Sequence, residues 1–331
     1  MLLVLSVLCA MVPMVTLLAL VWWLDRYDRE PMWILGLTFL WGALGATLLA
    51  LVGNTTAELG LQFALGAEHA ATITPVLVAP LVEEPTKAVV LLLVLMSRHF
   101  DNTTDGFVYG AAVGLGFGMT ENLLYFSQVA HLTSFDPLLG LKAWATTVAM
   151  RTAYSAILHA TTTSIVGASL GFARFRSWPV RLLVVPLGFA LAMGIHGLWN
   201  GLLTVDASQG LEGRLTQANL VVFPAEAFTT FLVFQLALLS ERRDIRKELE
   251  AEARDGTLPA AHVPSIASYL ARGRPGWTPL GVPREAYVRA TTTLAYRRRQ
   301  SRMRPDDPFY REEVERLRRE VVGLLEMARP T

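Results

Sequence analysis

The sequence predicts an all-α fold: a polytopic membrane bundle of about seven transmembrane helices, followed by a small helical tail. The 331 residues are 53% hydrophobic and 17% charged, a composition typical of membrane proteins. Apolar runs of spanning length recur through the first 240 residues, whereas 19 of the 29 basic residues lie after them. We therefore predict a transmembrane domain over residues 1–240 and a charged cytosolic tail over residues 241–331.

The predicted spans are apolar runs of about 20 residues, the length a helix needs to cross a bilayer. They cover residues 2–23, 32–52, 75–96, 105–126, 144–172, 180–204 and 217–239. The first run lacks a basic start and is too long for the apolar part of a signal peptide, so we interpret it as a membrane helix. The single cysteine, Cys9, lies within it, which excludes an internal disulfide and a cysteine-based metal site.

Basic residues gather in alternate loops between these spans. With the N-terminus outside, the inner loops hold Arg26, Arg29, Arg98, Arg174, Arg176 and Arg181, and the basic tail follows. The outer loops hold Lys142 and Arg214, and residues 53–74 are expected to form one of these loops. Because basic loops stay in the cytoplasm, we predict a multi-pass protein of the plasma membrane with its N-terminus outside and its C-terminus cytosolic.

The tail is expected to form a small helical module. Helices are predicted at about residues 284–300 and 309–327, after a stretch broken by proline and glycine. The second carries an apolar stripe that requires a partner surface: Val314, Leu317, Val321, Leu324 and Leu325. We expect anionic lipid or a cytosolic partner beside this basic tail, and no nucleic acid.

Charged residues interrupt the third apolar run. It contains Glu83, Glu84 and Lys87, although a charge at the centre of a membrane helix costs roughly 2.5–3.5 kcal/mol and is usually paired or functional. Lys87 lies four positions after Glu83 on the same helix face, which favours an ion pair between them. Glu84 points about 100° away from Glu83 and has no predicted partner on its own helix. We therefore expect these carboxylates to be retained for function.

The fourth run combines glycines with two polar residues. Gly110, Gly114 and Gly118 recur every four residues, a spacing that lets another helix approach closely. Glu121 and Asn122 follow near the outer end of the run. Packing explains the glycines, whereas Glu121 is a candidate for a site.

The fifth and sixth runs add further polar residues. Arg151, Ser155 and His159 recur at intervals of four in the fifth run, which forms a stripe that must face protein or water rather than lipid. His196 and Asn200 are also four apart in the sixth run, so their side chains project in the same direction.

Four predicted helices thus bring polar residues to a similar depth in the outer half of the bilayer. We predict that these residues line one polar cavity: Glu83, Glu84, Glu121, Arg151, His159, His196 and Asn200. A carboxylate in such a cavity is a suitable general base for water. Histidine and asparagine can donate hydrogen bonds to a developing oxyanion.

The sequence lacks a serine nucleophile elbow and a His-Glu-x-x-His zinc motif, so no cofactor is expected. Zinc bound by a glutamate and two histidines stays open as an alternative. A non-catalytic transporter or receptor-like scaffold is a second alternative, because proton relays use the same residue types. Adjacent glutamates and the lack of an inverted repeat favour hydrolysis.

These motifs resemble the PrsW family of intramembrane proteases, which is related to the CAAX prenyl proteases and the CPBP-type membrane proteins. The resemblance covers roughly residues 20–205 and rests on Glu83-Glu84-x-x-Lys87, the glycine-rich run from Asp105 to Glu121-Asn122, His159, and His196-Gly-x-Trp-Asn200. The position of Lys87 and the presence of Glu121 depart from the CAAX pattern, which argues against prenyl-protein processing.

The resemblance implies hydrolysis of a peptide bond in a membrane-embedded or membrane-proximal protein, typified by an anti-sigma factor. It implies a glutamic-type mechanism in which Glu83 and Glu84 activate water and His159, His196 and Asn200 bind the carbonyl. Supporting roles are expected for Lys87, Glu121, Asn122 and Arg151.

Overall fold

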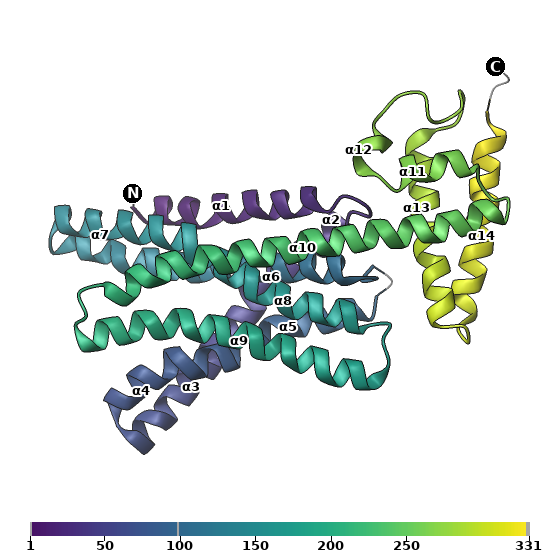
Figure 1. Cartoon of the computed structure of the whole chain (residues 1–331). Helices are drawn as coiled ribbons and strands as arrows, with labels where there is room; N and C mark the ends of the chain where they lie inside the picture. Colours follow the sequence, from purple (N-terminus) through teal and green to yellow (C-terminus); the bar gives the residue numbers. More distant parts are fainter. Residues whose placement is uncertain (1, 98, 329–331) are drawn as a thin grey trace. The chain divides into compact units, whose positions relative to one another are not determined.

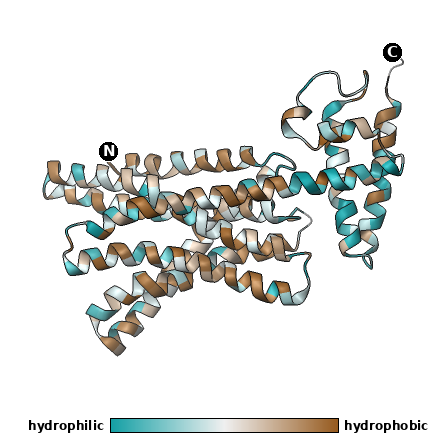
Figure 2. Ribbon diagram, viewed as in Figure 1, coloured by the Kyte–Doolittle hydropathy of each residue, from teal (hydrophilic) through white to brown (hydrophobic). Residues whose placement is uncertain are grey.

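The computed structural model describes residues 2–97 and 99–328, and these residues form helices and no strand, which confirms the all-α fold. The chain divides into two compact units. Unit 1 comprises Met1–Leu24 and Glu30–Val233, and unit 2 comprises Asp25–Arg29 and Phe234–Thr331. Apolar residues dominate the helices of unit 1, whereas those of unit 2 are mostly hydrophilic (Figure 2).

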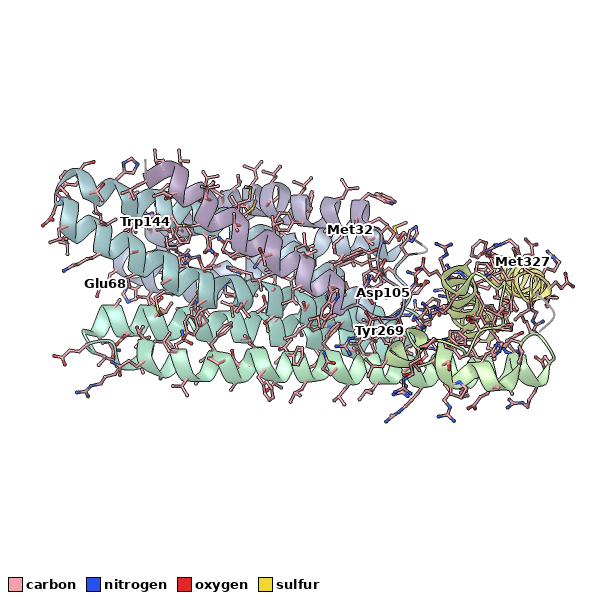
Figure 3. The ribbon with its side chains drawn as sticks, turned by 90° about the horizontal axis from the view of Figure 1, so that it is seen from above. Met32, Glu68, Asp105, Trp144, Tyr269 and Met327 are labelled. Carbon is pink, nitrogen blue, oxygen red and sulfur yellow. The ribbon has the colours of Figure 1, made fainter. Side chains whose placement is uncertain are left out.

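Unit 1 is a helical bundle (Figure 1). Its helices are α1 (Leu2–Leu24), α2 (Met32–Leu40), α3 (Thr47–Leu65), α4 (Ala67–Ile73), α5 (Ala79–Leu95), α6 (Thr103–Ala130), α7 (Pro137–Met150), α8 (Ala156–Ala173), α9 (Trp178–Gln209) and the first part of α10 (Arg214–Arg254). Three π-helical segments, η1 (Trp41–Ala46), η2 (Thr74–Val78) and η4 (Arg151–Ser155), and the 3-10 turn η3 (His131–Ser134) lie between them. Labelled side chains mark the two ends of the bundle, with Met32 and Asp105 at one end and Glu68 and Trp144 at the other (Figure 3).

Five helical stretches in the described chain are long and apolar enough to cross a membrane, and they coincide with five of the predicted spans. These are Leu2–Leu24, Met32–Leu65, Pro137–Ala173, Trp178–Gln209 and Arg214–Arg254. The other two predicted spans are largely helical as well: residues 75–96 contain all of α5 and most of η2, and residues 105–126 lie within α6. They contain charged residues and glycines, and neither is among those five stretches. A count of seven spans therefore stays a prediction.

The prediction of an outer loop at residues 53–74 is wrong, because α3 continues to Leu65 and α4 follows it. Residues 59–65 are largely apolar and contain no helix breaker after Gly60. The turn comes only at Gly66, which adopts a φ of 86°, a conformation that glycine accepts without strain.

Helix α6 lies at the centre of unit 1, and its residues from Val108 to Gly118 are all buried. Gly110 and Gly114 face α8, a close helix contact of the kind their spacing predicts, whereas Gly116 faces α2. A Cβ atom at Gly114 would lie 2.1 Å from the carbonyl oxygen of His159, and one at Gly110 would lie 2.4 Å from that of Thr163. Only glycine permits this approach, which brings His159 on α8 beside α6.

Unit 2 contains the end of α10, the short η5 (Ala260–His262), α11 (Val263–Ile266) and α12 (Tyr269–Arg272), and the longer α13 (Arg284–Met303) and α14 (Pro308–Glu326). The last two helices begin within one residue of their predicted starts. The apolar stripe of α14 packs into the core of this unit, where Val314, Leu317 and Val321 are buried in one cluster with Leu294. The partner surface that the stripe requires is therefore supplied by the chain itself.

Glu252 on α10 is a buried carboxylate that accepts hydrogen bonds from three side chains of unit 2. Burial raises the pKa of Glu252, but hydrogen bonds from Arg318, Thr257 and Arg298 outweigh it and hold the pKa below its ordinary value. A carboxyl group whose pKa falls on folding stabilises the protein above its unfolded pKa, and this contribution disappears as the pH falls through the folded pKa.

We expect Glu252→Ala to destabilise unit 2 by about 1–3 kcal/mol at pH 7, since it removes a buried acceptor and leaves the hydroxyl of Thr257 and the partly exposed Arg298 and Arg318 without it. The difference from the wild type should shrink as the pH falls below about 4, where the unfolded carboxyl is protonated. Hydrogen exchange of α14 in the full chain measures both effects. Glu250→Ala, which removes an exposed pair with Arg246, is the matched control and should change little; equal effects of the two substitutions would contradict the prediction.

Candidate functional site

A cavity of about 420 Å³ lies inside unit 1 among α3, α5, α6, α8 and α9. Six of the seven residues predicted to share a cavity line it: Glu83, Glu121, Arg151, His159, His196 and Asn200. Asn54, Phe117, Tyr125 and Ser155 also contribute to its wall. The predicted convergence of four helices on one polar cavity is therefore confirmed, with the exception of Glu84, which is fully buried behind the wall.

Glu83 is the carboxylate of α5 that faces the cavity. The amide of Asn54 donates to its Oε1 at 3.2 Å, and Lys87 Nζ lies 3.5 Å from its Oε2. His196 Nε2 lies 3.8 Å from the same oxygen. Sequence reasoning missed Asn54 because it was assigned to a loop. The available signal was that the apolar run continues past the predicted span, which places this polar residue within a helix.

Glu84 has three partners, so the prediction that it lacks one on its own helix is wrong. Lys87 Nζ donates to Glu84 Oε1 at 2.9 Å, a shorter distance than to Glu83. Residues three apart on a helix are neighbours as well as those four apart, and the long lysine side chain lies between both carboxylates. The hydroxyl of Thr162 and Nδ1 of His196 also contact Glu84 Oε1, at 3.2 and 2.9 Å.

Glu84 orients the imidazole of His196. An ionised carboxylate only accepts hydrogen bonds, so the proton of His196 lies on Nδ1 and the lone pair on Nε2. This nitrogen points toward Glu83 and the cavity. Carboxylates commonly orient metal-ligating histidines in this way.

His159 connects Lys87 with Glu121. Lys87 Nζ lies 3.1 Å from His159 Nδ1, and Glu121 Oε2 lies 2.5 Å from His159 Nε2. A lysine ammonium only donates, so Nδ1 of His159 accepts a hydrogen bond from Lys87. The ring proton then lies on Nε2, which donates a hydrogen bond to Glu121. The rings of His159 and His196 pack edge to face at 5.2 Å between centroids.

Arg151 links several residues on one side of the cavity. It lies at the start of η4, and its Nη2 is 2.8 Å from Glu121 Oε2 and donates to the hydroxyl of Ser155 at 3.1 Å. Its Nε donates to Asn122 at 3.0 Å, and its guanidinium lies 3.7 Å from the centre of the Tyr125 ring. The residues predicted to support the site thus form one connected network.

Asn200 completes a turn of η2 as well as lining the cavity. In this π-helical turn the N–H of Ala79 bonds to Thr74, five residues earlier, and the next carbonyl in the series, that of Pro75, would require an N–H from Pro80. Proline has no N–H. The side-chain amide of Asn200 donates to Pro75 instead, at 2.9 Å, so one of the donors predicted for an oxyanion is used by the fold.

The same residues fit a metal ion. Ligand atoms of Glu83, His159 and His196 lie within 4.8 Å of one another, and all three side chains are buried. Two imidazoles and a carboxylate suit zinc. With neutral histidines, three carboxylates face two cations, Lys87 and Arg151, and the surplus negative charge favours an added cation.

Known proteins resemble this chain over the region that contains the site. The family model described as "PrsW family intramembrane metalloprotease" matches residues 30–240, a range that contains every predicted site residue. Protease PrsW of Bacillus subtilis (strain 168) is 28% identical over 196 residues, which cover 58% of this chain and 79% of that protein. Protease PrsW of Clostridioides difficile (strain 630) is 36% identical over 111 residues, 33% of this chain and 45% of that protein. No solved structure matches the chain.

Proposed function

Because the chain belongs to the PrsW family of intramembrane metalloproteases, a family of membrane peptidases acting on proteins in or near the membrane, we propose that its hydrolytic centre is the cavity lined by Glu83, His159 and His196. The observation that carries this proposal is the convergence of these three buried ligand atoms within 4.8 Å inside an apolar bundle. Family membership also argues against the non-catalytic alternatives.

Glu83, His159 and His196 would hold the metal ion that the family description implies, and this proposal replaces the expectation that no cofactor is needed. A bound ion would polarise the substrate carbonyl and lower the pKa of water. To bind the ion through Nε2, His159 would have to give up its hydrogen bond to Glu121 and carry its proton on Nδ1, which accepts from Lys87 in this structure. Glu84 supports the site by fixing the orientation of His196.

The chain's own residues supply the remaining functions. Arg151 lines the cavity and carries five N–H donors, which supports a role in binding the substrate carbonyl that sequence reasoning assigned to Asn200. Glu83 is the carboxylate of α5 that lines the cavity, so it is the one that would act on the reacting water. In a metal-free, glutamic-type form of the reaction Glu83 would take the proton of that water.

Removal of metal distinguishes these two forms. We expect the purified chain to contain about one zinc ion, to cleave a single-span test protein in detergent, and to lose this activity by about 100-fold or more after chelation. Added zinc should restore it, and His196→Ala should lack bound zinc by elemental analysis. Full activity in metal-free protein would instead establish the glutamic-type form.

We also propose that the substrate is a single-span protein of the anti-sigma-factor type and that the enzyme lies in the plasma membrane with its C-terminus cytosolic. The arginines of alternate loops support this orientation. A C-terminal fusion to a fluorescent protein that folds only in the cytosol reads it out directly, and a dark fusion would reverse the assignment.

A further inference from the structure

A second cavity of unit 1, of about 670 Å³, lies among α6, α8, α9 and α10. We call it the α9–α10 groove. Its wall is apolar, with Ile165, Leu191, Ile195, Val222 and Val233 among its residues. Leu191 and Val233 are about half exposed, at 51% each, so the groove opens on the outer surface of the bundle, where helices predicted to span a membrane face lipid.

One acidic residue, Glu226, interrupts this apolar wall. It lies on α10 near the middle of the stretch predicted to cross the membrane, and it is half-buried beside Thr229 and Thr230. Within the described part of the chain its carboxyl group has no hydrogen-bond or ion-pair partner. An unpaired acidic residue at this depth is costly and typically marks a functional contact.

Three aromatic side chains separate the groove from the active-site cavity. Phe223 of α10 packs against Trp199 of α9 and Tyr154 of η4, with ring centroids 5.1 and 5.9 Å apart. Trp199 lines the active-site cavity, and Ile195, one turn before it, lines the groove. The two cavities are therefore neighbours across this aromatic cluster.

Helix α10 is the wall of the groove best able to move. Its backbone approaches no helix of unit 1 as closely as α8 approaches α6 and α9, although α9 and α10 run side by side (Figures 1 and 3). The side chain of Asn219 ties it to the carbonyl of Trp199 at 3.1 Å. Pro224 directly follows Phe223 and removes one backbone hydrogen bond, which makes this point of the helix easy to bend.

We propose that the α9–α10 groove binds the transmembrane helix of the substrate and that displacement of Phe223 admits the adjoining peptide to the cavity of Glu83. The inference rests on the proposed function of that cavity. A helix fits better than a lipid chain, because a basic or amide side chain on the helix can pair with Glu226, whereas an acyl chain leaves this carboxyl unpaired. The substrate class is thus a single-span protein with such a residue within its span.

Two substrates that share one cleavage sequence test the proposal: a single-span protein and a short peptide without the span. Ala225→Trp fills the groove, and we expect it to lower kcat/KM for the single-span protein at least ten-fold while changing that for the peptide less than two-fold. Phe228→Trp, on an exposed part of α10 outside the groove, is the control and should change neither. Replacing the basic or amide residue of the span by leucine should abolish any effect of Glu226→Gln.

Several results would overturn the inference. Ala225→Trp could cleave the single-span protein as fast as the wild type, or lose both substrates equally, which would indicate damage to catalysis or folding. A photoreactive benzoylphenylalanine at Val222 should cross-link the single-span protein; cross-links to lipid alone would assign the groove to lipid. If the wild type cleaves the peptide and Ala225→Trp has no selective effect on the single-span protein, only the groove is refuted. If the wild type cleaves neither substrate, the proposed function is refuted as well.

Discussion

Glu83→Gln is expected to lower the rate of peptide hydrolysis by about 10²–10⁴-fold, the usual contribution of a positioned acid–base group, while leaving the fold intact. Glutamine has the same shape and can still accept a hydrogen bond from the amide of Asn54. It carries no charge, however, so it neither accepts a proton from water nor binds a metal ion well. The rate of cleavage of a single-span substrate measures the effect, and zinc content measures the loss of the ligand.

Two matched variants distinguish the role of Glu83 from that of other glutamates. Glu58→Gln changes the same residue type on α3, where the carboxylate accepts from Gln62 at 3.0 Å outside the cavity, and should leave activity unchanged. Glu84→Gln keeps an acceptor for His196 and should cost 10–100-fold at most, roughly the effect of an outer-shell partner. A larger loss for Glu84→Gln than for Glu83→Gln would exchange the roles of the two carboxylates.

Helical periodicity made much of the site predictable from sequence. Arg151, Ser155 and His159 share a face because they are four residues apart, and their predicted common stripe faces the cavity. Gly110 and Gly114 predicted a close helix contact, and that contact positions His159. Local spacing of this kind requires no knowledge of the tertiary fold.

Contacts that depend on tertiary structure were not predictable. The bond between Asn200 and Pro75 exists because a π-helical turn aligns a carbonyl with Pro80, a register that no local pattern indicates. Unit 2 includes residues 25–29, where Tyr27 accepts from Arg272, although 245 positions separate these residues. A division predicted at residue 240 from the composition of the sequence could not include such a distant contact.

Lys87→Met is expected to destabilise the folded chain by about 3–5 kcal/mol, the cost of leaving a buried charge without its partner. Lys87 is fully buried, contacts both Glu84 and Glu83, and lies 4.1 Å from the centre of the Phe117 ring. Without its ammonium group, two adjacent carboxylates repel each other in a medium of low polarity, and His159 loses the donor at Nδ1. The thermal unfolding midpoint in detergent and the amount of protein in the membrane should both fall.

A double-mutant cycle separates this charge effect from the lost packing. Lys87→Met and Glu84→Gln together remove one cation and one anion, so the pair should recover much of the stability that Lys87→Met alone loses, with a coupling energy within about 0.5–3 kcal/mol. Lys142→Met, at an exposed position on α7, controls for loss of a lysine and should leave the midpoint unchanged. Additive effects of the two substitutions would show that the carboxylates do not depend on Lys87 for their burial. Lys87 would then not count as a cation in the charge balance of the metal site.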